Sequence, residues 1–154
     1  MAAAQTQAPQ PNFRFRFSVR DCPTETFDSF TGLFMKGLGG GGFPPPTATT
    51  NLFLSAQQLQ TISDRVTAIG FFDYPARFIG IPLGLDEVLI TTPYLSYTLE
   101  VHSGERSHTV AWDDKSEPTT AAADRLRDLF SVIIQFIHDR PEYKRLPPGI
   151  MGCM

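Results

Sequence analysis

Hydrophobic and polar residues alternate most clearly over residues 94–114. A period of two is typical of a strand with one buried face. At Gly104-Glu105 a glycine in the first position favours a two-residue type II′ turn. The turn fixes a register that a slip of one residue would destroy, so the segment predicts a β-hairpin. The expected apolar-face pairs are Val101 with His108, Leu99 with Val110, and Tyr97 with Trp112.

The same alternation predicts a strand near the start of the chain. Phe13, Phe15, Phe17 and Val19 alternate with Arg14, Arg16, Ser18 and Arg20. The three arginines share one face of this strand. We expect a solvated face that discourages edge pairing, rather than an anion-binding site.

Two further strands are expected before the first helix. Residues 27–35 predict a strand antiparallel to the first, weakened or bulged at Gly32. Residues 51–54 predict a short third strand. After the first helix, residues 74–93 form a long connection, which in a compact domain is either functional or packed on something. Within it, residues 88–91 are a candidate strand piece.

Two segments have helical periodicity. The first is capped by Ser55, with Gln58 completing a capping box, and it stops at Gly70. The second is capped by Thr119 or Thr120 and ends near residue 139, before a proline. Their apolar faces consist of Leu59, Ile62, Val66 and Ile69 in the first helix, and of Leu126, Leu129, Phe130, Ile133, Phe136 and Ile137 in the second.

These elements follow the order β-β-β-α-β-β-α. We therefore expect an α+β fold, in which an antiparallel sheet of four or five strands carries two helices on one face. The order predicts a single domain over residues 13–139, preceded by a flexible tail (residues 1–12). Residues 140–154 form an apolar, proline-rich C-terminal extension that we expect to pack on the domain.

Residues 37–49, GLGGGGFPPPTAT, form a low-complexity loop. Consecutive glycines and prolines sustain neither a strand ladder nor a helix, and no GK[ST] follows as in a phosphate-binding loop. Phe43, Pro44 and Pro45 begin a run that has the look of a polyproline ligand for a small recognition domain. A plain loop is the alternative. We name these three residues as candidate partner-binding residues.

Composition narrows the class of protein. The 154 residues are enough for one domain with a core, and 42% hydrophobic with 19% charged residues is an ordinary globular mixture. A net charge of −3 argues against a general nucleic-acid binder, because phosphate binding needs a basic surface. No apolar run has the length that a membrane span requires.

The N-terminal residues leave two localisations open. The sequence MAAAQTQAPQPN has neither a charged region nor a long apolar run, so it is no complete signal peptide. We favour a cytoplasmic protein with a disordered tail over an exported one whose signal precedes the stated start. Cys22 and Cys153 fit no metal or redox spacing. We expect them to be joined in an exported protein and free in a cytoplasmic one.

Candidate catalytic and metal-binding residues are few. His102 and His108 lie on opposite faces of the expected hairpin, so we expect them not to share a metal ion. His138 is expected on the polar side of the last helix. Asp113 and Asp114 precede that helix, whose positive end favours them electrostatically. Because no standard catalytic or nucleotide-binding motif occurs, we predict no enzyme, no cofactor, no metal site and no small-molecule substrate.

Four short runs carry a resemblance to a known family: residues 70–75 (GFFDYP), 97–101 (YTLEV), 108–110 (HTV) and 113–114 (DD). They resemble a group of small bacterial domains that includes emfourin, the protein inhibitor of the thermolysin-like protease protealysin. The resemblance covers most of residues 13–139 and implies a similar fold and inhibition of a metalloprotease. The chain departs from the group in its Gly/Pro loop, its long connection and its C-terminal extension, and no inhibitory residue is carried over.

The second helix also carries Val132 and Ile134, which flank its apolar stripe and widen the apolar arc to roughly 200°. One sheet face needs about a third of the helix, so we expect one flank to bind another protein unless the C-terminal extension covers it. We therefore predict a non-catalytic protein-binding domain, an accessory or regulatory subunit of a larger assembly. The alternatives are a protein inhibitor of a metalloprotease and an unrecognised hydrolase.

Overall fold

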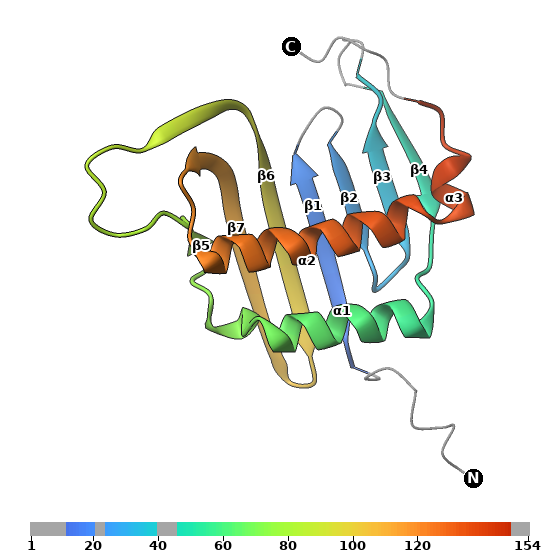
Figure 1. Cartoon of the computed structure of the whole chain (residues 1–154). Helices are drawn as coiled ribbons and strands as arrows, with labels where there is room; N and C mark the ends of the chain where they lie inside the picture. Colours follow the sequence, from blue (N-terminus) through green and yellow to red (C-terminus); the bar gives the residue numbers. More distant parts are fainter. Residues whose placement is uncertain (1–11, 21–23, 40–45, 149–154) are drawn as a thin grey trace.

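The computed structural model describes residues 12–20, 24–39 and 46–148. In this part of the chain a seven-stranded mixed sheet carries helices on one face (Figure 1), in the strand order β4-β3-β2-β1-β6-β7-β5. The predicted α+β class is therefore confirmed. The strands are β1 (Arg14–Arg20), β2 (Glu25–Asp28), β3 (Leu33–Gly37), β4 (Thr47–Asn51), β5 (Arg77–Phe78), β6 (Leu89–Ser103) and β7 (Arg106–Glu117). The helices are α1 (Ala56–Ala68), α2 (Ala121–His138) and α3 (Pro141–Lys144), with a 3-10 turn, η2 (Phe71–Asp73).

The prediction of four or five antiparallel strands is wrong in two respects. The single strand expected over residues 27–35 is two strands, because the chain turns between Asp28 and Leu33. The Asp28 side chain accepts a hydrogen bond from the Phe30 amide, and the Asp28 carbonyl accepts one from the Gly32 amide. In addition, β5 pairs with β7 in parallel, which makes the sheet mixed.

The strand expected over residues 51–54 lies earlier in the chain. β4 pairs with β3 along its whole length, from Leu33 opposite Asn51 to Gly37 opposite Thr47. The two strands therefore occupy both ends of the predicted loop 37–49, where the threonines of β4 suit a pleated surface. Leu52 and Leu54 instead lie buried in the segment that leads into α1.

The central hairpin is confirmed in register. Val101 lies opposite His108, Leu99 opposite Val110 and Tyr97 opposite Trp112. Gly104, the first central residue of the turn, has a φ of 64°, and in the described part of the chain only glycines have a positive φ. Glu105, the second central residue, therefore has a negative φ, as the type II′ pattern requires.

Both predicted helices are also confirmed. Ser55 and Gln58 form the capping box of α1, and Thr120 accepts the N-terminal hydrogen bond of α2 from the Ala123 amide. The prediction of only two helices missed α3, a single turn with Pro141 at its first position, where proline is favoured. Tyr143 and Leu146 pack against the core, so the C-terminal extension contacts the domain as far as Leu146.

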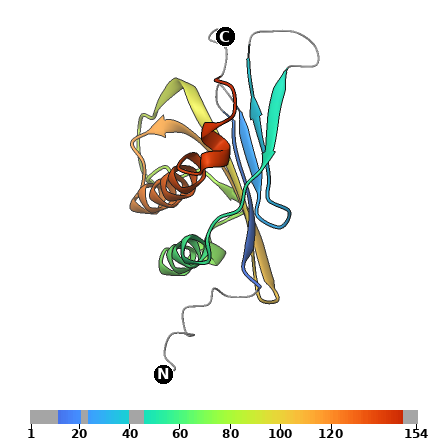
Figure 2. The ribbon, with the colours of Figure 1, turned by 90° about the vertical axis from the view of Figure 1, so that its right-hand side faces the viewer.

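The core lies between one face of the sheet and the pair α1 and α2, while the described elements leave the other face open (Figure 2). Stacked aromatic rings join the layers: Tyr97 of β6 lies 4.5 Å from Phe130 of α2 and 5.9 Å from Trp112 of β7, centroid to centroid. On the open face, Arg16 forms ion pairs with Asp28 and Glu100. This arginine therefore belongs to a solvated strand face, as the sequence predicts.

Candidate protein-binding surface

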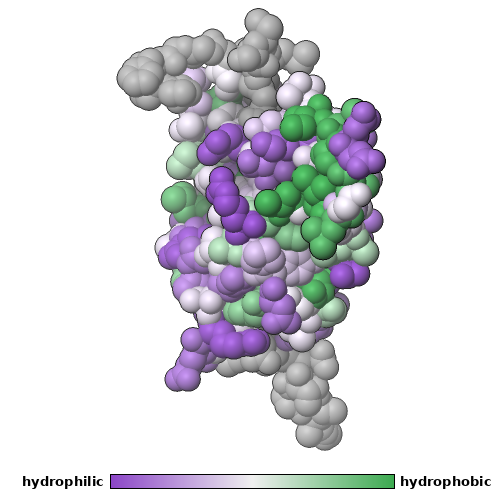
Figure 3. All heavy atoms as spheres, turned by 90° about the vertical axis from the view of Figure 1, so that its left-hand side faces the viewer, coloured by the Kyte–Doolittle hydropathy of each residue, from purple (hydrophilic) through white to green (hydrophobic). Residues whose placement is uncertain are grey.

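Exposed apolar side chains gather at the edge of the sheet that carries β5 and the start of β6. Among the described residues, seven of the eleven exposed large apolar side chains come from residues 79–94, and Leu83 is 99% exposed. Each residue of the segment 83–94 is exposed. Figure 3 shows a continuous hydrophobic area on this side of the molecule. We call the following seven residues the edge patch: Ile79, Leu83, Leu85, Val88, Leu89, Ile90 and Tyr94.

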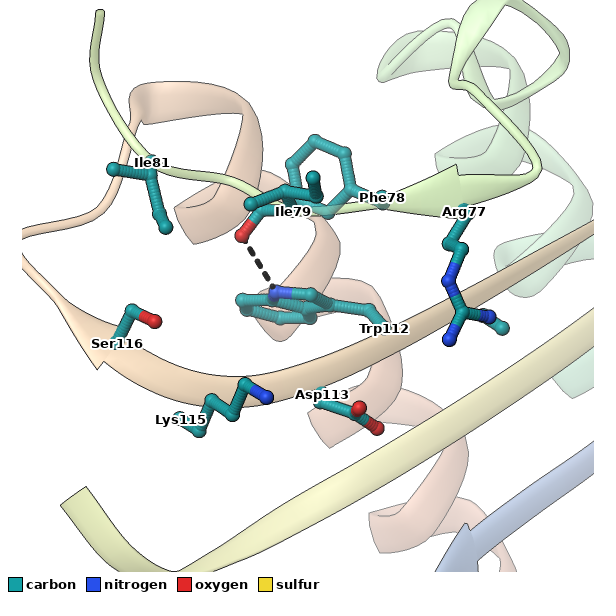
Figure 4. A pocket seen from close by; sticks show the side chains of 9 residues that line it. Arg77, Phe78, Ile79, Ile81, Trp112, Asp113, Lys115 and Ser116 are labelled. Carbon is teal, nitrogen blue, oxygen red and sulfur yellow. Dashed lines mark hydrogen bonds between the residues drawn. The ribbon is translucent and has the colours of Figure 1, made fainter. Parts of the chain in front are cut away.

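The base of the edge patch is anchored in the core. The indole N–H of Trp112 donates a hydrogen bond to the Ile79 carbonyl (3.3 Å), and the Phe78 ring lies 5.5 Å from the Trp112 ring (Figure 4). The Gly80 carbonyl accepts a hydrogen bond from the amide of Thr120, the cap of α2. The chain therefore leaves a fixed point at residues 78–80 before it becomes exposed.

The far end of the edge patch is a two-stranded ribbon. β1 pairs with β6 only as far as Ser96, so the earlier residues of β6 pair with β7 alone. Leu89 lies opposite Glu117 and Ile90 opposite Ser116, and the pairing is then irregular up to Leu95. An isolated two-stranded ribbon is only marginally stable in water. The ribbon therefore gains from any apolar surface that covers it.

Recesses adjoin the edge patch on two sides. One, of about 290 Å³, opens where the chain after β5 leaves β7, and Arg77, Asp113 and Lys115 line it together with Trp112 (Figure 4). A second, of about 620 Å³, is lined by Leu89 and two carboxylates, those of Glu87 and Glu117. The first recess thus carries the cations Arg77 and Lys115 together with the carboxylate of Asp113. The charged residues of the second recess are carboxylates alone.

The paired aspartates do not lie at the N-terminal end of the last helix, where the sequence analysis places them. β7 extends to Glu117, so Asp113 and Asp114 lie within it and face opposite sides of the sheet. Asp114 faces α2, where Arg127 donates two hydrogen bonds to its carboxylate, at 2.9 and 3.0 Å. These bonds raise the pKa of Arg127. Asp114 therefore fixes α2 to β7, whereas Asp113 is exposed beside the edge patch.

The histidines of the hairpin lie on opposite faces, as predicted. His102 contacts Glu100 and the Phe30 ring on the open face of the sheet. His108 lies on the helix side, where its Nε2–H donates to the Tyr74 carbonyl (2.6 Å). The His102 contact is the largest cause of the lowered pKa of Glu100.

His138 is half-buried on α2. Its Nε2 is 2.7 Å from a Glu25 carboxylate oxygen, and its ring stacks 4.1 Å from that of Tyr143. Glu25 is far away in the sequence and Tyr143 lies beyond the end of α2, so helical periodicity alone could not identify these partners. In the described ranges, no three His, Cys, Asp or Glu side chains form a group that could hold a metal ion.

The candidate partner-binding residues are not brought together. Phe43, Pro44 and Pro45 lie outside the described residues, as do Cys22 and Cys153. Val132 and Ile134 are half-buried, and Ile134 packs against the core. Their role in binding stays a prediction. α1 lies beside α2 and α3 packs at its end, so these neighbours cover much of the arc that the sequence suggests is free (Figure 1).

Sequence reasoning missed the edge patch itself. Residues 79–90, IGIPLGLDEVLI, are rich in apolar side chains but follow neither the helical nor the strand period. The available signal was the high apolar content of the long connection 74–93, which also contains two glycines and three prolines. Because helix α2 has a clearer periodic pattern, the prediction placed the binding surface on α2 and not on this segment.

Two further results concern the whole chain. Among the described residues, no helix combines the length and apolar content needed to cross a membrane. A scan against protein-family models and a search of curated proteins found no match. The resemblance to the emfourin group therefore stays a prediction.

Proposed function

We propose that this chain is a non-catalytic protein-binding domain, an accessory or regulatory subunit that contacts its partner through the edge patch. The observation that carries the proposal is the run of exposed residues 83–94, in which large apolar side chains face solvent. Single exposed apolar side chains are normal on a protein surface, but a contiguous group of this kind marks an interaction site.

The size of the edge patch supports a protein partner. Taking about 200 Å² for a fully exposed large side chain, the seven residues expose on the order of 800 Å². The largest apolar patch on a typical monomer covers roughly 300–600 Å². A standard interface between two proteins buries about 800 Å² on each side. The edge patch therefore has the area of one half of a specific protein interface.

The arrangement of the edge patch also suits binding. Its base is held by Trp112, Phe78 and the hydrogen bond from Thr120 to Gly80, so a partner need not order this part. The irregular segment that follows can adjust to a partner, at some cost in conformational entropy. The charged residues around the recesses supply the polar rim that surrounds the apolar centre of many interfaces.

Capture of partners from an extract of the cells that make the protein tests this proposal. We expect the tagged wild-type chain to retain a partner that the double variant Leu83→Asn, Leu89→Asn loses. Leu33→Asn is the matched control, because Leu33 is an exposed leucine on β3, three strands away from β6. Equal capture by the wild type and the double variant, with both folded, would refute the edge patch as the binding surface.

The same capture experiment tests the helix flank. Val132→Asp places a charge on α2, away from the residues of the edge patch. Undiminished capture by a folded Val132→Asp variant would show that this flank is not the interface. Loss of the partner in this variant alone would favour the flank over the edge patch.

Inhibition of a metalloprotease is the second candidate function. The observation that favours it is Leu83, which is almost fully exposed beside Gly84 in an irregular segment and could enter a hydrophobic specificity pocket. This candidate predicts that the chain slows peptide hydrolysis by a thermolysin-like protease and that Leu83→Asn weakens the inhibition. An unchanged rate at a large excess of the chain would refute it.

A further inference from the structure

The charges around the edge patch are divided between its two recesses. Arg77 and Lys115 line one, together with Asp113, whereas Glu87 and Glu117 line the other. Asp86 precedes Glu87 in the exposed segment. None of these six side chains forms an ion pair with another residue that the structure describes. We call the first recess the basic end of the edge patch and the second its acidic end. Lys115 and Glu117, which border the two ends, lie two residues apart on one face of β7.

Such a surface is complementary to itself. In a two-fold symmetric interface, a group at one end of the patch in one copy faces the group at the other end in its partner, and the reverse contact occurs as well. Two copies placed in this way bring Arg77 and Lys115 of each chain towards Glu87 and Glu117 of the other. Asp113 weakens the attraction, but each contact stays attractive because the two cations of one chain still face two carboxylates of the other.

The apolar area agrees with this arrangement. Two edge patches of about 800 Å² each would bury about 1,600 Å² in total, which is the standard size of a stable interface. The ribbon formed by the start of β6 and the end of β7 would then lie against apolar side chains of the other copy instead of water. The charge pattern therefore favours a second copy as the occupant, and the area is sufficient for a stable dimer.

We propose that the partner of the edge patch is a second copy of this chain, in a two-fold symmetric dimer. This inference rests on the proposed function, since it names the partner of the same surface. The dimer would be the unit that enters any larger assembly. In such a dimer the second copy covers the exposed leucine and isoleucine side chains of the edge patch, so no foreign protein is needed to cover them.

Sedimentation of the purified chain tests the dimer. Over about 1 to 100 μM, a range suited to interfaces of this area, we expect the mass to approach twice the 17.1 kDa of one chain. The first variant, Arg77→Glu with Lys115→Glu, makes both ends acidic. The second variant, Glu87→Lys with Glu117→Lys, makes both ends basic. We expect each variant alone to shift towards the mass of one chain, because like charges then meet at both contacts.

A mixture of the two variants provides the decisive comparison. In a mixed pair every altered end faces an altered end of opposite charge and every native end faces a native one, so we expect dimers to return. A mixture that stays monomeric, or wild-type protein with the mass of one chain at every concentration, would overturn the dimer.

The two proposals fail in different ways. If the wild type is monomeric but Leu83→Asn with Leu89→Asn still abolishes partner capture, the edge patch binds a different protein and only the dimer is refuted. If the wild type is monomeric and capture is unchanged by that double variant, the proposed function fails as well. Circular dichroism of each variant establishes that it is folded before either conclusion is drawn.

Discussion

Tyr143 shows how a single residue joins the end of the chain to the sheet. Its hydroxyl donates a hydrogen bond to the Glu25 carboxylate (3.2 Å), its ring stacks on His138, and the Lys36 ammonium lies 5.2 Å from its ring centroid. Burial, with a further contribution from the negative charge of Glu25, raises the pKa of Tyr143 to about 12. The neutral phenol is thus the form that the folded protein favours.

This shift predicts a loss of stability in alkali. In the unfolded chain a tyrosine loses its proton near pH 10. Because the folded-state pKa is higher, the contribution of Tyr143 is fully present below pH 10 and is lost as the pH rises towards about 12. We expect Tyr143→Phe to flatten the dependence of the unfolding free energy on pH in this range, as measured by urea denaturation. An equally steep dependence in the variant would assign the effect to other groups.

Gly80 is the residue at which the anchored base of the edge patch allows least change. Its φ is +73°, and an added Cβ would lie 2.9 Å from the Phe78 ring and 3.1 Å from the Ala123 Cβ. Gly84 has a similar φ of +79° but open space around it. Gly80→Ala should therefore combine backbone strain with a steric clash, whereas Gly84→Ala has the strain alone.

Urea denaturation of the two glycine variants measures this difference. Strain of this kind costs about 1–3 kcal/mol, and the clash should make Gly80→Ala the more destabilised of the two by about 1 kcal/mol or more. Equal losses in both variants would show that the contact between residues 78–80 and α2 is loose.

At the scale of single elements, the N-cap of α1 has the clearest energetic role. Ser55 accepts a hydrogen bond from the Gln58 amide, and the Gln58 side chain accepts one from the Ser55 amide. Replacing such a cap with alanine costs about 1 kcal/mol. We expect Ser55→Ala to lower the unfolding free energy by this amount and Ser55→Asp to retain most of it. Thermal unfolding would contradict this prediction if the alanine variant matched the wild type.

Elements that depend on local pattern could be predicted from the sequence. The hairpin, α1 and α2 have a clear period together with a defined turn or cap, so their presence and the register of the hairpin follow from neighbouring residues. The hairpin strands nevertheless extend beyond the predicted residues 94–114, to Leu89 and Glu117. The break between β2 and β3 could not be found in this way, because the apolar residues Phe27 and Phe34 fit one strand as well as two. β5 has only two residues, and its existence depends on pairing with Ala111 and Trp112 far along the chain.

The candidate site is less predictable for a related reason. The sequence draws attention to Val132 and Ile134 because helical periodicity makes unused apolar positions visible. Whether such positions are free depends on α1 and α3, whose packing the pattern of α2 does not contain. Conversely, the segment 83–94 has no period, so only its three-dimensional exposure identifies it.

At the scale of the whole molecule, the edge of the sheet near β5 differs from the rest in the amount of apolar surface that it exposes. The sheet, α1 and α2 enclose a well-packed aromatic core, and most exposed apolar side chains lie beyond it, at the edge near β5. A protein that works alone in water gains nothing from such a segment. The central claim is therefore that residues 83–94 are covered by another protein chain in the functional state.

Hydrogen exchange of residues 83–88 tests this claim most directly, because these residues lie outside the strands and helices of the described chain. We predict slow exchange in concentrated wild-type protein or in the captured complex. In the double variant Leu83→Asn, Leu89→Asn we predict fast exchange at the same concentration. Fast exchange of these amides in the wild type under every condition, including the complex, would contradict the claim that another chain covers this segment.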